Sequence, residues 1–247
     1  MDSISTTTTP TSTTARDLVA GGFTLFVLAL TLRLAFSLPA GFLALSAVLY
    51  AVQGALILRY WPGRKPFGWA NRATLARSVI VLALIAWAPY LGGQPAPALW
   101  TYALLSLGAL ILDGVDGKVA RATGSHSEFG ARFDMELDAL FILGLCLAVL
   151  ALDKAGTWVL ALGLMRYAFI AASLGFAWLN ANLPDSFRRK TVCVWQVVTL
   201  MVAVIPIIPP AFASLTLGLA LVLLAWSFFV DVRWLYQRRH NHDSAKP

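Results

Sequence analysis

Long apolar stretches separated by short polar ones fill most of this 247-residue chain. A helix that crosses a membrane needs about 20 mostly apolar residues, and eight stretches come close to or exceed that length. They are residues 18–36, 41–60, 73–92, 97–121, 132–152, 156–181, 191–208 and 210–235. Proline and glycine mark turns between them at Pro39, at Gly92 and Gly93, and between Pro206 and Pro210. The pattern predicts an all-α fold, a polytopic membrane helical bundle.

Composition supports the same class of protein. Hydrophobic residues make up 59% of the chain and charged residues 13%, whereas soluble domains carry about 25% charged residues. Segment 1–17 begins MDSISTTTTPTS, has no apolar pattern, and is expected to be a disordered tail. Residues 238–247 form a second polar tail. Cys146 and Cys193 are isolated within apolar segments, and we expect them to be small buried hydrophobic residues.

The basic residues predict how the chain is oriented in the membrane. Sixteen of the nineteen Lys and Arg residues fall at the ends of the predicted spans that face one side. Because short cytoplasmic segments are rich in Lys and Arg, both termini are expected to be cytoplasmic. The polar segment between the fourth and fifth spans then opens on the same side.

That segment and its flanks hold an unusual concentration of carboxylates. Six of the twelve acidic residues lie between Asp113 and Asp138. Asp113 and Asp116 are three residues apart at the end of one helix, and Asp134 and Asp138 are four apart at the start of the next, so each pair shares a helix face. The sequence ATGSHSEFG between them is typical of a turn. Four carboxylates are therefore expected to converge near the cytoplasmic interface.

Charged groups at membrane depth are costly, and a cluster of like charges is retained where a cation neutralises it. Oxygen ligands suit Mg²⁺, Mn²⁺ or Ca²⁺, and four carboxylates suffice for two divalent ions. Glu136 points to another helix face, and Glu128 is expected to be solvated in the turn. The alternative is a carboxylate-lined ion path.

Three of the residues that follow Asp116 suit the approach of a phosphorylated ligand. Gly117 and Ala120 lie at helical spacing and leave the backbone accessible. Arg121 follows one turn after Gly117, and its guanidinium group is suited to a diphosphate. Under the alternative interpretation, the two small residues serve helix packing.

The full spacing adds a resemblance. The chain reads Asp113-x2-Asp116-Gly117-x2-Ala120-Arg121-x8-Gly130-x3-Asp134-x3-Asp138. At all eight defined positions it resembles the signature of the CDP-alcohol phosphatidyltransferase family. The spans from about residue 73 to 235 are similar to that family's six-helix core, which gives an expected transferase domain at 61–237. Segment 18–60 contains two additional transmembrane helices.

The resemblance implies an activity. The expected protein is an integral membrane transferase that moves a phosphatidyl group from a CDP-alcohol, CDP-diacylglycerol being the expected donor, to the hydroxyl of a small polar acceptor. CMP would be released in phospholipid biosynthesis. Asp113, Asp116 and Asp134 are expected to bind the first of two Mg²⁺ or Mn²⁺ ions. Asp138 is expected to bind the second ion and to act as the general base. Gly130 would allow the two motif helices to approach closely.

A second stretch resembles the family's site for the CDP part of the donor. It reads Asn71-x2-Thr74-x2-Arg77, at the start of the first core helix. The expected CDP-binding residues are Asn71, Thr74, Arg77, Asp113, Gly117, Ala120 and Arg121. The alternative is that Asn71 is only a helix N-cap and Arg77 only a charge that sets topology.

Basic residues near the predicted cavity suggest the nature of the acceptor. They are Arg132, Arg166, Arg188, Arg189 and Lys190. If they surround the cavity, the acceptor carries a phosphate, as glycerol 3-phosphate and inositol phosphate do. The alternative is that Arg166 pairs with a motif carboxylate and that the cluster at 188–190 anchors its helix.

The remaining expectations concern partners and location. The partners are a CDP-alcohol lipid donor, a small alcohol acceptor and membrane lipids, with no nucleic acid, and the resemblance implies a homodimer. The expected location is a bacterial inner membrane, with the active site facing the cytoplasm. The alternative functions are a catalytically silent relative and a carboxylate-lined cation transporter.

Overall fold

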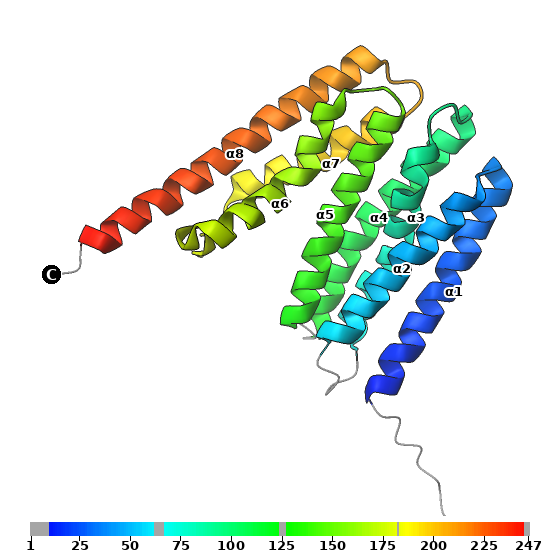
Figure 1. Cartoon of the computed structure of the whole chain (residues 1–247), viewed down its shortest axis with the longest axis horizontal. Coiled ribbons are helices and arrows are strands. Elements are labelled where there is room, and N and C mark those ends of the chain that lie inside the picture. Colours follow the sequence, from blue (N-terminus) through cyan, green and yellow to red (C-terminus); the bar gives the residue numbers. More distant parts are fainter. Residues whose placement is uncertain (1–9, 62–66, 124–126, 182, 245–247) are drawn as a thin grey trace, which may run out of the picture. The chain divides into compact units, whose positions relative to one another are not determined.

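The computed structural model describes residues 10–61, 67–123, 127–181 and 183–244, without the side chains of 10–12, 115–123, 177 and 239–244. The described residues form eight α-helices and no strand; Figure 1 draws these helices and labels them. The helices are α1 (Pro10–Phe36), α2 (Ala40–Tyr60), α3 (Trp69–Trp87), α4 (Ala96–Thr123), α5 (Glu128–Ala151), α6 (Leu160–Gly175), α7 (Phe187–Val204) and α8 (Pro210–Ser244). Three short 3-10 turns are η1 (Ala88–Tyr90), η2 (Thr157–Val159) and η3 (Ala177–Asn180). The predicted all-α fold is confirmed.

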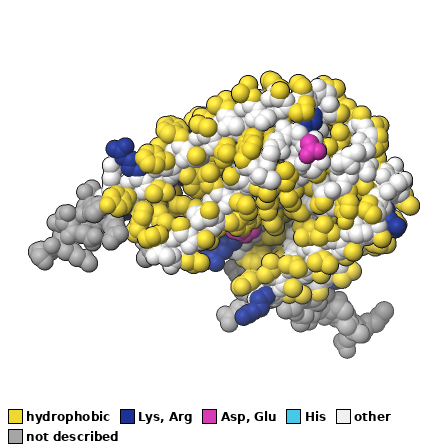
Figure 2. Space-filling model, turned by 45° about the horizontal axis from the view of Figure 1, so that its top comes forward, with side chains coloured by type: hydrophobic (Ala, Val, Ile, Leu, Met, Phe, Trp, Pro, Cys, Tyr) yellow, Lys and Arg dark blue, Asp and Glu magenta, His cyan; other side chains and the backbone are white. Residues whose placement is uncertain are grey.

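Six helical segments of the described ranges are long and apolar enough to cross a membrane. They are Thr13–Phe36, Ala40–Tyr60, Trp69–Tyr90, Ala96–Gly114, Thr157–Gly175 and Pro210–Arg238. Hydrophobic side chains cover most of the face in Figure 2, as expected for a surface in contact with lipid. The chain is therefore an integral, multi-pass membrane protein. The two other helices, α5 and α7, each carry three or more charged residues.

The two cysteines differ in their surroundings. Cys146 on α5 is buried, as expected, whereas Cys193 on α7 is exposed. The apolar pattern did not distinguish them, because a membrane helix presents apolar side chains to lipid as well as to its neighbours.

Residues 1–141 and 142–247 form two compact units, and each is described by itself. In the first unit α3 is central, because it contacts α1, α2 and α4, and 67% of its spanning segment is buried. Trp87 of α3 stacks on Phe36 and meets Tyr102 edge-on, with ring centroids 5.2 and 5.6 Å away. Burial of such large aromatic side chains contributes strongly to a helical core.

The two helices that precede α3 are joined to each other and to α3 by polar as well as apolar contacts. Helices α1 and α2 lie side by side (Figure 1), and the Tyr50 hydroxyl donates to the Leu18 carbonyl at 2.6 Å. Gln53 Nε2 donates to Ser78 Oγ on α3 at 2.8 Å. Since buried polar groups are stable when they find partners, these bonds fix α1 and α2 in the same unit as α3.

The limit of the predicted disordered N-terminal tail needs correction. Helix α1 begins at Pro10, so residues 10–17, expected to be disordered, are helical. Proline suits the first position of a helix, and Thr14 and Leu18 are buried, so tertiary contacts override the polar composition. Helix α8 continues to Ser244, into the segment 238–247, whose assignment as a cytoplasmic tail stays a prediction. Residues 1–9 lie outside the described residues.

In the second unit α7 packs along α8, which also contacts α6. Gly163 allows α6 to approach the second part of α5, since a Cβ at this glycine would lie 2.9 Å from Leu143 Cα. The Lys154 ammonium group, in a residue only 8% exposed, donates to the carbonyls of Ile205 and Ile208 beyond the end of α7. The buried cation is thereby satisfied by backbone oxygens.

Candidate active site

Three of the four predicted carboxylates converge in the first unit. Asp113 lies on α4, and Asp134 and Asp138 lie on the same face of α5. Each offers one oxygen, and these oxygens lie within 4.8 Å of one another. Their side chains are 38%, 42% and 47% exposed, respectively. The three carboxylates are thus only partly buried within the first unit.

The guanidinium group of Arg77 lies among these carboxylates. Its Nη1 donates to Asp113 and, at 3.1 Å, to Asp138, and its Nη2 donates to Asp134. The Arg77 side chain is only 2% exposed. The motif Asn71-x2-Thr74-x2-Arg77 predicts that Arg77 binds the donor, and it does not predict the role of Arg77 as a counter-ion. The position of Arg77 in the sequence indicates this role, because an arginine two turns into a membrane-spanning helix needs acidic partners.

The cluster fits a divalent metal ion in both charge and size. Three carboxylates and one guanidinium give these four side chains a net charge of −2, which a divalent cation would balance. Oxygen atoms on opposite sides of Mg²⁺ are about 4.2 Å apart, and the three carboxylate oxygens lie within 4.8 Å of one another, so the three groups are near enough to share one ion. An all-oxygen donor set also favours hard cations. The residues present therefore suit Mg²⁺ or Mn²⁺.

Asn71 and Thr74 precede Arg77 on α3 and are both buried. Asn71 Nδ2 donates to the Phe67 carbonyl at 2.6 Å, and its Oδ1 has no hydrogen-bond partner among the described residues. The N-cap of α3 is Gly68, so Asn71 lies in the first turn and does not cap the helix. Arg77 is also buried. This position does not agree with the alternative in which the charge of Arg77 only sets the orientation of the chain in the membrane.

Gly130 brings the beginning of α5 against α3. A Cβ at this position would lie 2.5 Å from Asn71 Oδ1 and 3.0 Å from Ser127 Oγ. Such distances leave no space for a methyl group unless a neighbour moves. Gly130 is therefore the position at which the acidic helix α5 meets the buried amide of Asn71.

We expect Gly130→Ala to destabilise the protein relative to Gly108→Ala. Both substitutions gain helix propensity, but a Cβ at Gly108 on α4 meets nothing within 4 Å. Displacing Asn71 breaks its bond to Phe67, so the free energy of unfolding should be about 1–2 kcal/mol lower for Gly130→Ala than for Gly108→Ala. Thermal unfolding of both variants in detergent measures this difference. Equal stability would show that Asn71 moves aside without cost.

Several predicted site residues contribute no described side chain. Asp116, Gly117, Ala120 and Arg121 continue α4 beyond Asp113, and their side chains lie outside the described part of the structure. Glu128 and Glu136 are exposed. Helical spacing places Glu136 on a different face of α5 from Asp134 and Asp138.

The residues predicted to bind an acceptor phosphate are distributed over both units. Arg132 in the first unit and Lys190 in the second are exposed, and Arg166 on α6 is half-buried. Arg188 on α7 donates to Asp231 and to Ser227 on α8. Arg189 donates to the Pro184 carbonyl and lies 3.5 Å from Asp231. The pairing with Asp231 is what the helix-anchoring alternative expects, and acceptor binding stays a prediction.

Comparison with known proteins assigns this arrangement to a family. The family model for CDP-alcohol phosphatidyltransferase matches residues 67–230. The chain belongs to this family. The match includes Asn71, Arg77 and the whole stretch from Asp113 to Asp138, whereas α1 and α2 precede it. Members of the family are transferases that act on CDP-alcohols, and they generally use divalent metal ions.

One curated relative shares a short stretch of sequence. Over 61 residues the chain is 39% identical to cholinephosphotransferase 1 of Xenopus laevis, which is 24% of this chain and 15% of the relative. The chain thus covers only a small part of that protein's length. No solved structure matches the chain.

Proposed function

We propose that the chain transfers a phosphatidyl group from CDP-diacylglycerol to the hydroxyl of a small polar alcohol and releases CMP. The observation that carries this proposal is the cluster of Asp113, Asp134 and Asp138 around Arg77, at the position of the family's signature. Its charge and its exposure suit a metal-bound diphosphate. The transferase domain would comprise residues 61–237, and α1 and α2 would be additions to it.

Each residue of the cluster has a role in this proposal. Asp113 and Asp134, with Asp116, would hold one divalent ion, and Asp138 would contribute to a second. When bound, the ions would offset the charge of the diphosphate and polarise the phosphorus. Asp138 would take the proton of the acceptor hydroxyl as its oxygen bonds to the phosphorus and CMP departs. The protein then needs no nucleophile of its own.

The neighbouring residues would position the donor. Asn71 Oδ1, which has no hydrogen-bond partner among the described residues, would accept a hydrogen bond from the CDP part. Arg121, with Gly117 and Ala120 on the same helix, would contact the diphosphate. Arg77 would hold the carboxylates of α4 and α5 together and limit their mutual repulsion.

The position of Arg77 also weighs against the transporter alternative. A cation passing through a carboxylate-lined path would meet a buried guanidinium group that contacts all three carboxylates. This positive charge would repel a cation in transit. A site that holds a metal ion and an anionic diphosphate together suits the arrangement better.

Two acceptor classes can be separated by experiment. The basic residues favour a phosphate-bearing acceptor such as glycerol 3-phosphate or inositol phosphate, whereas the name of the cholinephosphotransferase relative favours choline chemistry. Purified protein would be given radiolabelled CDP-diacylglycerol with glycerol 3-phosphate, inositol phosphate, inositol or serine, and separately CDP-choline with diacylglycerol. We expect a labelled lipid with one of the two phosphorylated acceptors. Phosphatidylcholine from CDP-choline would favour the second class, and no product from any donor would contradict the proposal.

We further propose that the active site faces the cytoplasm of a bacterial inner membrane and that the protein is a homodimer. The orientation rests on the distribution of Lys and Arg. The dimer rests on the family resemblance alone.

A further inference from the structure

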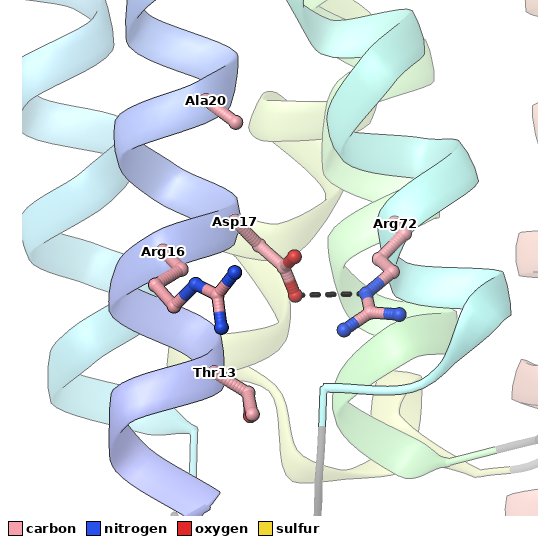
Figure 3. Close-up of a pocket in the computed structure, with 5 residues that line it drawn as sticks. All are labelled: Thr13, Arg16, Asp17, Ala20 and Arg72. Atoms are coloured by element: carbon pink, nitrogen blue, oxygen red, sulfur yellow. Dashed lines mark hydrogen bonds and ion pairs between the residues drawn. The ribbon is translucent and has the colours of Figure 1, made fainter. Parts of the chain in front are cut away.

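A second polar site lies between the beginnings of α1 and α3, away from the carboxylate cluster. It is an open pocket of about 430 Å³ (Figure 3). Its lining residues are Thr13, Arg16, Asp17, Ala20 and Arg72. Arg72 and Arg77 are five residues apart on α3, so they point about 140° away from each other. The pocket therefore faces α1, whereas Arg77 faces α4 and α5.

The two arginines flank one carboxylate. Arg72 Nε donates to Asp17 Oδ2 at 2.8 Å, and the Arg72 guanidinium carbon lies 5.2 Å from the centre of the Trp69 ring. These two contacts fix the orientation of Arg72. In Figure 3 the guanidinium groups of Arg16 and Arg72 both turn toward the space between the helices. With Asp17 between them, the pocket has a net charge of +1.

The pocket lies at the depth of lipid headgroups. Among the described residues, the segments of α1 and α3 that are apolar enough to span a membrane start at Thr13 and Trp69, and Arg16 and Arg72 lie in the first turn of these segments. Trp69 is 66% exposed, and exposed tryptophans are enriched at the membrane–water interface. A ligand in this pocket would therefore have its polar group at the interface.

An exposed apolar stripe continues from the pocket along α1. Val19, Phe23 and Val27 follow Arg16 at helical spacing and are 74%, 69% and 46% exposed. A ligand with a polar head in the pocket could thus lay an apolar chain along this stripe. A soluble phosphate compound would make no use of it.

We propose that this pocket binds the phosphate group of an anionic phospholipid, whose acyl chain lies along Val19 and Phe23. A guanidinium group can donate two hydrogen bonds to phosphate oxygens. The net charge of +1 matches the single negative charge of a phosphodiester. This proposal does not depend on the proposed transfer reaction, because the site lies on the opposite side of α3 and uses a helix that precedes the family match.

The packing beneath the pocket makes it a fixed feature. Leu18 of α1 and Leu75 of α3 belong to one buried cluster with Ile57 and Phe67. Phe133, adjacent to Asp134 in the chain, packs against the same cluster. The apolar layer therefore holds α1 to α3 and extends to the acidic helix α5.

The test is native mass spectrometry of the full-length protein in detergent, titrated with phosphatidylglycerol and with phosphatidylcholine of the same chains. We expect one phosphatidylglycerol to bind tightly and Arg16→Gln to lower its affinity about fivefold. Arg59→Gln is the matched control, because it removes an equal charge from an exposed position in the last turn of α2, outside the pocket. Ala20→Phe fills the pocket without changing charge and should reduce binding as much as Arg16→Gln.

Three results would overturn the proposal. The first is equal loss of affinity in Arg16→Gln and Arg59→Gln, which would indicate surface charge alone. The second is equal binding of phosphatidylcholine. The third is displacement of the lipid by inorganic phosphate in millimolar excess, which would make the pocket a site for soluble phosphate. Unchanged thermal unfolding of Arg16→Gln and Ala20→Phe confirms that a loss of binding does not arise from misfolding.

Discussion

Asp138→Asn is expected to lower kcat by about 10²–10⁴-fold, the usual contribution of general-base assistance, while the donor still binds. Asparagine has nearly the same size as aspartate and offers a carbonyl oxygen to a metal ion or to Arg77, which lies 3.1 Å from Asp138. It cannot take the proton of the acceptor hydroxyl. The measurement is kcat against Mg²⁺ concentration, with donor binding measured separately.

Asp134→Asn is a matched control for this substitution, because Asp134 lies one turn earlier on the same face of α5 and also contacts Arg77. We expect it to weaken metal binding, so that extra Mg²⁺ restores much of the rate, and we expect the same of Asp116→Asn. If high Mg²⁺ restores Asp138→Asn to near the wild-type rate, Asp138 is only a ligand. The base would then lie elsewhere, with Glu136 the nearest acidic candidate in the sequence.

Replacing Arg77 with glutamine should destabilise the metal-free protein by about 1–3 kcal/mol. Removing one partner of a buried ion pair costs about 3–5 kcal/mol, and solvent around the half-exposed carboxylates reduces that cost. The repulsion among three carboxylates should also make Mg²⁺ stabilise the variant more than the wild type. For scale, Mg²⁺ at 100 times its Kd would raise the free energy of unfolding by about 2.7 kcal/mol.

The measurement is thermal unfolding of wild type and Arg77→Gln in detergent, with Mg²⁺ and after chelation. Arg132→Gln serves as a control, since it removes the same charge from an exposed position on α5. Equal stabilisation of all three proteins by Mg²⁺ would mean that Arg77 is not the counter-ion of the metal site.

Helical periodicity explains why much of the site could be predicted. The spacing of three and four residues puts the aspartates of each helix on one face, and a polar turn between two apolar helices brings these faces together. The structure shows this convergence for Asp113, Asp134 and Asp138. Apolar length, which is a property of a contiguous segment, likewise predicted the six helical segments that are apolar enough to span a membrane. The segments at 132–152 and 191–208, also predicted to span, form the more polar helices α5 and α7.

The contacts between helices distant in sequence could not be predicted in the same way. The insertion of Arg77 among carboxylates from α4 and α5 depends on how α3 packs in the centre of the unit. The same holds for Gly130, whose missing side chain leaves space for Asn71. Residues 10–17 were misassigned for a related reason, since their helix depends on contacts such as that between Asp17 and Arg72.

Metal-dependent transfer from a CDP-alcohol, at the cluster around Arg77, is the activity that we propose. Its most direct test is the release of CMP by purified protein given CDP-diacylglycerol and the acceptor that yields a lipid product. We expect release with Mg²⁺ or Mn²⁺, none after treatment with a strong chelator, and recovery when metal is added back. Full turnover in the presence of the chelator would contradict it.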